Sequence, residues 1–137
     1  MVFRDSDGHD LPTADRYFVD VISCAALKNP DVVKDGSGKL VYYREADKEI
    51  MVMKTRLILQ IAKQKQITHL VLGALGCGAY RNPPEEVAKI FKKVIFGDGK
   101  RAAVSGIEEI VIAIFDDGEN LRAFREAFGG TEQASQT

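Results

Sequence analysis

The sequence predicts an α/β fold, in which a mostly parallel or mixed sheet is flanked by helices in three layers. Strand-like and helix-like segments alternate along the chain, as they do in α/β domains. The apolar runs at residues 70–72 and 110–114 are typical of strands that are buried on both faces. Residues 45–66 and 85–96 carry apolar side chains at helical spacing.

The N-terminal third is predicted to hold two strands and a long loop. Val2 and Phe3 begin as a short strand that ends at a turn over residues 5–8. Residues 17–24 are β-branched and aromatic, which favours a second strand, and the small residues Ala25 and Ala26 follow it. Residues 29–38 are polar and rich in turn formers, so we expect a surface loop there.

The central segment, residues 45–66, is predicted to be an amphipathic helix. Its expected apolar stripe is Ile50, Met53, Leu57, Ile58 and Ile61. We interpret Met51 and Met53 as core filling. His69 opens the next strand, and with only His9 as a second histidine we expect no metal site.

Residues 70–87 read as a buried strand, a glycine-rich turn and the start of a helix. The glycines allow close approach of a ligand to the main chain. Asn82 is the predicted N-cap, and Pro83 suits the first helical turn. Backbone N–H groups and a helix dipole together make such a turn a recurrent phosphate site. Ala79-Tyr80 does not fit a P-loop, and Arg81 stands where the dinucleotide fingerprint needs glycine. A tight turn without a ligand therefore stays an alternative.

The C-terminal part is predicted to contain helix 85–96, strand 107–115 and a last helix that starts after Asp117-Gly118. The expected core residues of the two helices are Val87, Ile90, Phe91, Val94, Ile95, Leu121, Phe124 and Phe128. Gly97-Asp98-Gly99 and Gly129-Gly130 should end the two helices. We expect one domain over residues 1–130 and a disordered tail over residues 131–137.

Charge, hydropathy and cysteine content indicate which kinds of partner and which cellular compartment to expect. The 19 basic and 20 acidic residues give a net charge of −1 without a basic patch, so nucleic acid is not the expected partner. No apolar run approaches a membrane span, and Arg4 and Asp5 make a signal peptide unexpected. Two cysteines do not form a disulfide framework, which favours an intracellular location, cytoplasmic or nuclear.

Ligands of parallel α/β sheets collect at the carboxyl ends of the strands. Three segments should meet at that edge, namely residues 23–26, 73–80 and 115–117. The candidate ligand-binding residues are Ser23, Gly73, Ala74, Gly76, Cys77, Gly78, Ala79, Tyr80, Asn82, Phe115 and Asp116. The backbone N–H groups of residues 76–80 would hold a diphosphate, which requires no charged side chain.

Residues 73–88 resemble the diphosphate-binding loop and following helix of the microbial-type poly(ADP-ribose) glycohydrolases, a branch of the macrodomain fold. Residues 2–5 with 17–26 look like the family's paired strands, and residues 110–117 look like its last strand. The resemblance implies a macrodomain-like fold that is reduced on its N-terminal side. The family's early strands, Gly-rich catalytic loop and pair of adjacent glutamates belong to a portion upstream of the part that is matched.

The resemblance also implies roles for side chains. Tyr80 would lie near the distal ribose, and Phe115 with Asp116 near the adenine. The alternatives are a half-buried Tyr80 under the helix start and a Phe115 that points into the core. We expect no catalytic residue and no cofactor. Cys77 lacks a base, and Glu85 and Glu86 suit a first helical turn for electrostatic reasons alone.

Three functions are left open by the sequence. The leading hypothesis is a module that binds ADP-ribose, free or attached to protein, without efficient hydrolysis. The second is a glycohydrolase in which Asp20 or Asp116 replaces the missing glutamates. The third is a non-binding assembly domain, because an uncovered sheet edge would favour pairing into a homo-oligomer.

Overall fold

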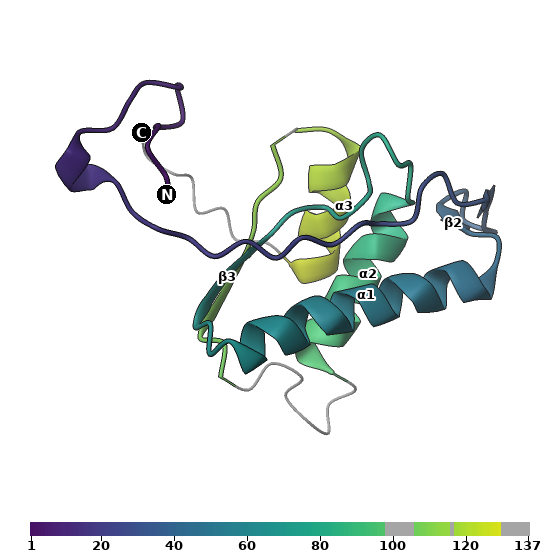
Figure 1. The fold of residues 1–137 in the computed structure, drawn as a ribbon. Helices are drawn as coiled ribbons and strands as arrows, with labels where there is room; N and C mark the ends of the chain where they lie inside the picture. The colour runs from purple at the N-terminus through teal and green to yellow at the C-terminus, as the bar shows by residue number, and fades with distance from the viewer. Residues whose placement is uncertain (98–105, 116, 130–137) are drawn as a thin grey trace.

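The computed structural model describes residues 1–97, 106–115 and 117–129, and it confirms the α/β class (Figure 1). The elements in chain order are a 3-10 helix η1 (Thr13–Asp15), β1 (Val32–Lys34), β2 (Leu40–Tyr42), α1 (Glu45–Gln64), β3 (His69–Leu72), α2 (Pro84–Phe96), β4 (Glu109–Ile112) and α3 (Glu119–Phe128). The expected helices therefore form close to their predicted bounds.

The strands of the described residues form two separate pairs. β1 and β2 are antiparallel, with Val32 opposite Tyr42. β3 and β4 are parallel, with His69 opposite Glu109 and Leu72 opposite Ile112. A parallel pair needs a crossover connection, and α2 lies in the connection between these strands. Both strands consequently end at the same edge of the sheet.

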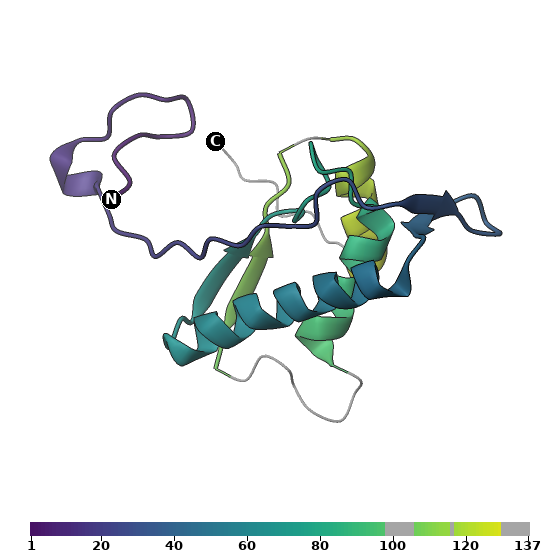
Figure 2. The same ribbon diagram turned by 45° about the vertical axis from the view of Figure 1, so that its right-hand side comes forward.

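The hydrophobic core lies between the β3–β4 pair and the three helices (Figures 1 and 2). All five core residues predicted on α2 are buried, namely Val87, Ile90, Phe91, Val94 and Ile95. Phe91 meets Phe124 of α3 edge to face, with ring centroids 5.6 Å apart. This geometry is the favourable one for an aromatic pair.

The expectation that β3 and β4 are buried on both faces is wrong. Leu72 is 7% exposed, but its neighbour Val71 is 67% exposed and Val111 on β4 is 46% exposed. Side chains alternate between the two faces of a strand, so one face of the pair packs on the helices and the other is open. An apolar run alone did not distinguish these two environments.

The predicted apolar stripe of α1 is shifted from the observed one. The buried residues are Met51, Thr55, Ile58, Leu59 and Ala62, whereas Met53 and Leu57 are exposed. Core filling is confirmed for Met51 and wrong for Met53. Apolar residues occupy two overlapping stripes of this helix, and contacts with α2 and β2 decide which of them is buried.

The N-terminal segment differs most from expectation. Residues 17–24 run beside β3 as extended chain, but they form no strand, and Phe18 and Val21 are more than three-quarters exposed. The expected strand at residues 2–3 is reduced to the isolated bridges Val2–Tyr17 and Arg4–Asp10. Within the described part of the chain, no ladder of hydrogen bonds joins these segments to the parallel pair.

The predicted surface loop contains the β1–β2 hairpin, which the sequence interpretation missed. Asp35 Oδ1 accepts hydrogen bonds from the backbone N–H groups of Ser37 and Lys39, at 2.8 and 3.0 Å. Such an Asx turn is a local way to reverse the chain. The hairpin matters for the site because it ends at Tyr42, which is buried.

The predicted ends of α2 and α3 are confirmed within the described residues. Gly97 and Gly129 are the C-caps of α2 and α3, and each donates its backbone N–H into the last turn of its helix. Asp98, Gly99, Gly130 and the predicted tail at residues 131–137 lie outside the described residues. None of the described helices combines the length and the apolar character that a membrane crossing requires.

Candidate functional site

The glycine loop, residues 73–82, joins the carboxyl end of β3 to the start of α2. It is closed by backbone hydrogen bonds from Cys77 N to Ala74 O (3.1 Å), Arg81 N to Gly78 O (2.9 Å) and Asn82 N to Gly76 O (3.0 Å). Gly76 has φ +76°, and a Cβ at this position would lie 2.5 Å from Ala26 Cβ. Only glycine satisfies both conditions, so the tight turn requires it.

The loop presents a row of unused backbone donors. The N–H groups of Gly76, Gly78, Ala79 and Tyr80 find no acceptor among the residues that the structure describes. Gly78, Ala79 and Tyr80 are exposed. The fifth donor expected from the sequence, Cys77 N–H, is instead used within the loop. Consecutive N–H groups of this kind suit an anion.

Asn82 is not the N-cap of α2, contrary to the sequence prediction. The N-cap is Pro83, the first helical residue is Pro84, and no side-chain hydrogen bond caps the helix. Asn82 is 1% exposed, and its Nδ2 donates to Leu27 O at 2.8 Å and to Gly76 O at 3.1 Å. Its Oδ1 accepts from the Tyr42 hydroxyl at 2.9 Å. Asn82 therefore lies behind the loop rather than at its surface.

Glu86, in the first turn of α2, is a carboxylate paired with two lysines. Glu86 is buried between the ammonium groups of Lys48 (3.0 Å) and Lys89 (3.1 Å). Burial by itself would raise the pKa of Glu86, but hydrogen bonds and charge from the two lysines outweigh it and hold this pKa below its usual value. The two cations neutralise a carboxylate that would otherwise oppose an anion at the loop.

Cys77 is a neutral buried thiol. Burial, with a smaller contribution from the negative charge of Glu85, raises the pKa of Cys77 to about 12. Glu85 Oε2 is itself buried, with no hydrogen-bond partner among the described residues. Since the thiolate is the nucleophilic form, this environment favours a structural role for Cys77.

The predicted meeting of three segments at one edge is partly visible. Ala113 N donates to Leu72 O at 2.7 Å, so the chains that leave β4 and β3 begin side by side. Phe115 is fully exposed, and its predicted alternative as a core residue is wrong. Tyr80 is 40% exposed at the rim of the loop. Ser23 is exposed on the extended segment, and Asp116 lies outside the described residues.

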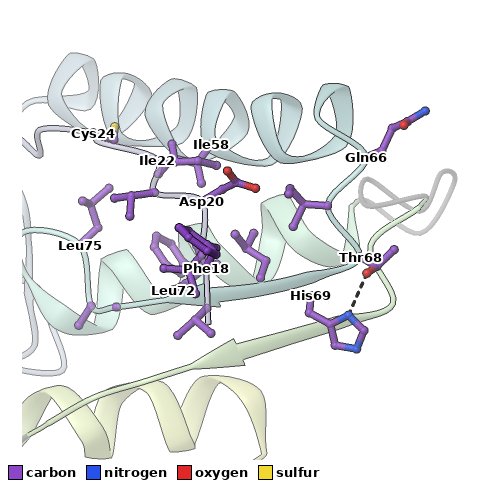
Figure 3. Close-up of a pocket in the computed structure, with 18 residues that line it drawn as sticks. Phe18, Asp20, Ile22, Cys24, Ile58, Gln66, Thr68, His69, Leu72 and Leu75 are labelled. Atoms are coloured by element: carbon purple, nitrogen blue, oxygen red, sulfur yellow. Dashed lines mark hydrogen bonds between the residues drawn. The ribbon is translucent and has the colours of Figure 1, made fainter. Parts of the chain in front are cut away.

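A groove of about 790 Å³ runs between residues 18–24 and β3 (Figure 3). Apolar side chains line most of it, including Ile22, Ile58 and Leu72, and Asp20 also lies there. It reaches the glycine loop only at residues 73–75 and does not include the unused donors. The sequence interpretation missed this groove because it paired residues 17–24 as a strand.

One cluster of potential metal ligands lies far along the chain from the loop. Ligand atoms of Asp5, Asp7 and His9 come within 4.8 Å of one another, and all three residues are exposed. Asp5 Oδ1 accepts from the backbone N–H groups of Asp7 and His9. The turn alone accounts for this proximity.

The chain is similar to crystal structures of poly(ADP-ribose) glycohydrolase from Deinococcus radiodurans. One complex with ADP-ribose has 32% identity and a TM-score of 0.56, covering 62% of this chain and 34% of that chain. Another ADP-ribose complex has 24% identity and a TM-score of 0.61, covering 93% and 49%. The apo form has 32% identity and a TM-score of 0.51, covering 62% and 36%. No protein-family model and no curated protein matches the chain.

These similarities confirm the macrodomain-like fold and the predicted resemblance to the poly(ADP-ribose) glycohydrolases. The chain spans about one third to one half of the length of the solved structures that it matches.

Proposed function

We propose that this chain binds ADP-ribose, free or attached to protein, and that the glycine loop holds the diphosphate. The observation that carries the proposal is the row of unused N–H groups at Gly76, Gly78, Ala79 and Tyr80, placed between the end of a parallel strand and a helix N-terminus. The similarity to an enzyme solved with ADP-ribose supports the choice of ligand.

The proposed complex uses backbone donors for the diphosphate and aromatic residues for the two ends of the ligand. Tyr80 belongs to the loop, and its side chain would contact the distal ribose. Phe115 leaves the adjacent strand with its ring in solvent, where it is free to stack on an adenine. Ser23, which is exposed, remains a candidate contact from the sequence, and Asp116 lies outside the described residues.

We further propose that this chain, taken by itself, does not hydrolyse the bound glycoside efficiently. A glycosidic acid needs to be positioned and to have a raised pKa. Glu86 has the opposite shift because two lysines hold it as a carboxylate. Asp20, one of the two substitute acids considered from the sequence, lies in the groove beside β3 and not at the unused donors of the loop. The other, Asp116, lies outside the described residues.

Calorimetric titration tests the binding proposal, with ADP-ribose as ligand and ADP and AMP as comparators. The critical variant is Gly78→Leu. Gly78 is exposed and a Cβ there meets no atom within 4 Å, so we expect the fold to accept the substitution and the leucine side chain to crowd the neighbouring donors. We expect ADP-ribose binding to wild type and at least tenfold weaker binding to Gly78→Leu.

Gly36→Leu is the matched control, because Gly36 lies in the hairpin turn and its Cβ would also meet open space. The control should bind as wild type does. Absence of ADP-ribose binding by the folded wild type would refute the proposal, as would equal affinities of the two leucine variants. Release of ADP-ribose from poly(ADP-ribose) by the purified chain would refute the second part.

A further inference from the structure

The glycine loop is held from behind by a buried hydrogen-bond network that neither the ligand nor the solvent would touch. Tyr42, at the end of β2, is 7% exposed, and its hydroxyl donates to Asn82 Oδ1 at 2.9 Å. The same amide donates through Nδ2 to Leu27 O and Gly76 O. One side chain thus joins the hairpin, the extended N-terminal segment and the loop.

The orientation of the Asn82 amide is fixed by its backbone partners, and the Tyr42 hydroxyl satisfies the oxygen that remains. An asparagine amide has an acceptor end and a donor end, and rotation by half a turn exchanges them. Backbone carbonyls only accept, so the NH₂ group must face the carbonyls of Leu27, Gly76 and Tyr80. Oδ1 is left to accept from the Tyr42 hydroxyl. Burial raises the pKa of Tyr42, with smaller contributions from nearby acidic groups, so the hydroxyl remains protonated and able to donate at neutral pH.

The orientation of the Gly76 carbonyl depends on this amide. Gly76 O accepts from both Asn82 Nδ2 and Asn82 N, at 3.1 and 3.0 Å. The carbonyl is thereby engaged within the loop, as is the next donor, Cys77 N–H, while the N–H groups of residues 78–80 have no acceptor among the described residues. Asn29 N donates to Tyr80 O at 2.9 Å, which restrains the far end of the same turn.

We propose that Tyr42 and Asn82 are positioning residues for the ligand. Their hydrogen bond sets the orientation of the backbone donors in the glycine loop before a diphosphate binds. This inference rests on the proposed function for its effect on affinity, but the conformational restraint can be measured without any ligand. Preorganised donors bind more tightly because ordering the loop costs nothing at the moment of association.

Tyr42→Phe removes only the hydroxyl and leaves the ring in the core, so it is the main test. The affinity for ADP-ribose should fall about tenfold, a change typical for the loss of one buried hydrogen bond. The affinity for AMP, which lacks the second phosphate, should fall less. Asn82→Asp is the second variant, because it keeps an acceptor for Tyr42 but loses the three Nδ2 hydrogen bonds to Leu27 O, Gly76 O and Tyr80 O, and it should weaken ADP-ribose binding further.

Cys77 supplies a readout that is independent of the ligand. The thiol is buried in the closed loop, so its alkylation by iodoacetamide, followed by peptide mass spectrometry, reports loop opening. We expect about tenfold faster alkylation of Cys77 in Tyr42→Phe, with little change at Cys24. Thr55→Val is the matched control, because it also removes one buried hydroxyl, which donates to Met51 O within α1. It should change neither the alkylation rate nor the affinity.

The outcomes separate this inference from the proposed function. Faster alkylation together with a lower ratio of ADP-ribose to AMP affinity supports the positioning role. Unchanged alkylation in both Tyr42→Phe and Asn82→Asp overturns it, whatever the ligand does. Faster alkylation with unchanged ADP-ribose affinity overturns the role in binding. A wild type that binds no ADP-ribose refutes the proposed function, while the alkylation rates still decide whether the hydrogen bond restrains the loop.

Discussion

Replacing Gly76 by alanine should destabilise the fold far more than the same change at Gly78, two residues along the loop. Gly76 has φ +76°, and its added Cβ would lie 2.5 Å from both Ala26 Cβ and Asn82 Nδ2. Gly78 has no positive φ, and its Cβ would meet nothing within 4 Å. The two variants differ by position only, so each is the control for the other.

The magnitude follows from two separate costs at Gly76. The left-handed conformation costs an alanine about 1–2 kcal/mol. Forcing an additional methyl group against buried neighbours costs about 1–3 kcal/mol more. The expected loss for Gly76→Ala is therefore about 2–5 kcal/mol of unfolding free energy. For Gly78→Ala we expect a change between zero and a gain of about 1 kcal/mol, because alanine reduces the entropy of the unfolded chain.

Urea denaturation followed by circular dichroism measures both variants at the same temperature and pH. A similar slope with a lower midpoint for Gly76→Ala would indicate a loss of stability without a change in the unfolded state. Equal midpoints for Gly76→Ala and Gly78→Ala would refute the reasoning, because neither the positive φ nor the close approach of Ala26 would then matter in solution.

Three further predictions concern the core, an ion pair and a thiol. Leu72→Ala should cost about 2–5 kcal/mol of unfolding free energy, whereas Val71→Ala on the open face should cost about 0.5 kcal/mol or less. Equal losses of stability in urea denaturation would show that the two faces of β3 are wrongly assigned. Glu86→Gln should cost about 1.5–3 kcal/mol of unfolding free energy at pH 7. Because the pKa of Glu86 is lowered in the folded state, the difference between the two proteins should shrink as the pH falls below 4.5, the ordinary pKa of this carboxyl. A difference that persists at pH 2–3 in denaturation curves would contradict the pairing with Lys48. The pKa of Cys77 is raised from 9.0 to about 12 in the folded state, so wild type should lose stability as the pH rises above 9 and Cys77→Ala should lose less. Parallel profiles of stability against pH for the two proteins would exclude the thiol as a source of this pH dependence.

Local signals in the sequence were sufficient for the helices and for the parallel pair. α2 shows this most clearly, since its five predicted core residues have the regular spacing of one helical face and all five are buried. The glycine loop was also recognisable, because Gly76 and its neighbours follow an apolar strand directly. These features depend on residues close together in the chain, where periodicity and backbone propensity act.

The errors occurred where a choice depended on distant partners. Met53 and Leu57 have the same local pattern as the buried residues of α1, and only packing against α2 and β2 separates the two stripes. Residues 17–24 have strand-forming side chains, but a strand also needs a neighbour with matching donors and acceptors. In the described structure only Tyr17 of this segment has such a partner, through its isolated bridge to Val2.

At Asn82 the role predicted from the sequence differs most clearly from the role that the tertiary structure gives it. The sequence by itself determined that an asparagine precedes Pro83 and α2 and that glycines surround it, which predicts a cap at the end of a flexible turn. The tertiary structure decided that its amide faces inward, between Tyr42 and the carbonyls of Leu27 and Gly76. The hydroxyl of Tyr42 lies 40 residues away in the chain, so no local pattern could place it within 2.9 Å of that amide. The physical reason is that a buried polar group must find its partners wherever the fold brings them, and these partners set the conformation of the loop.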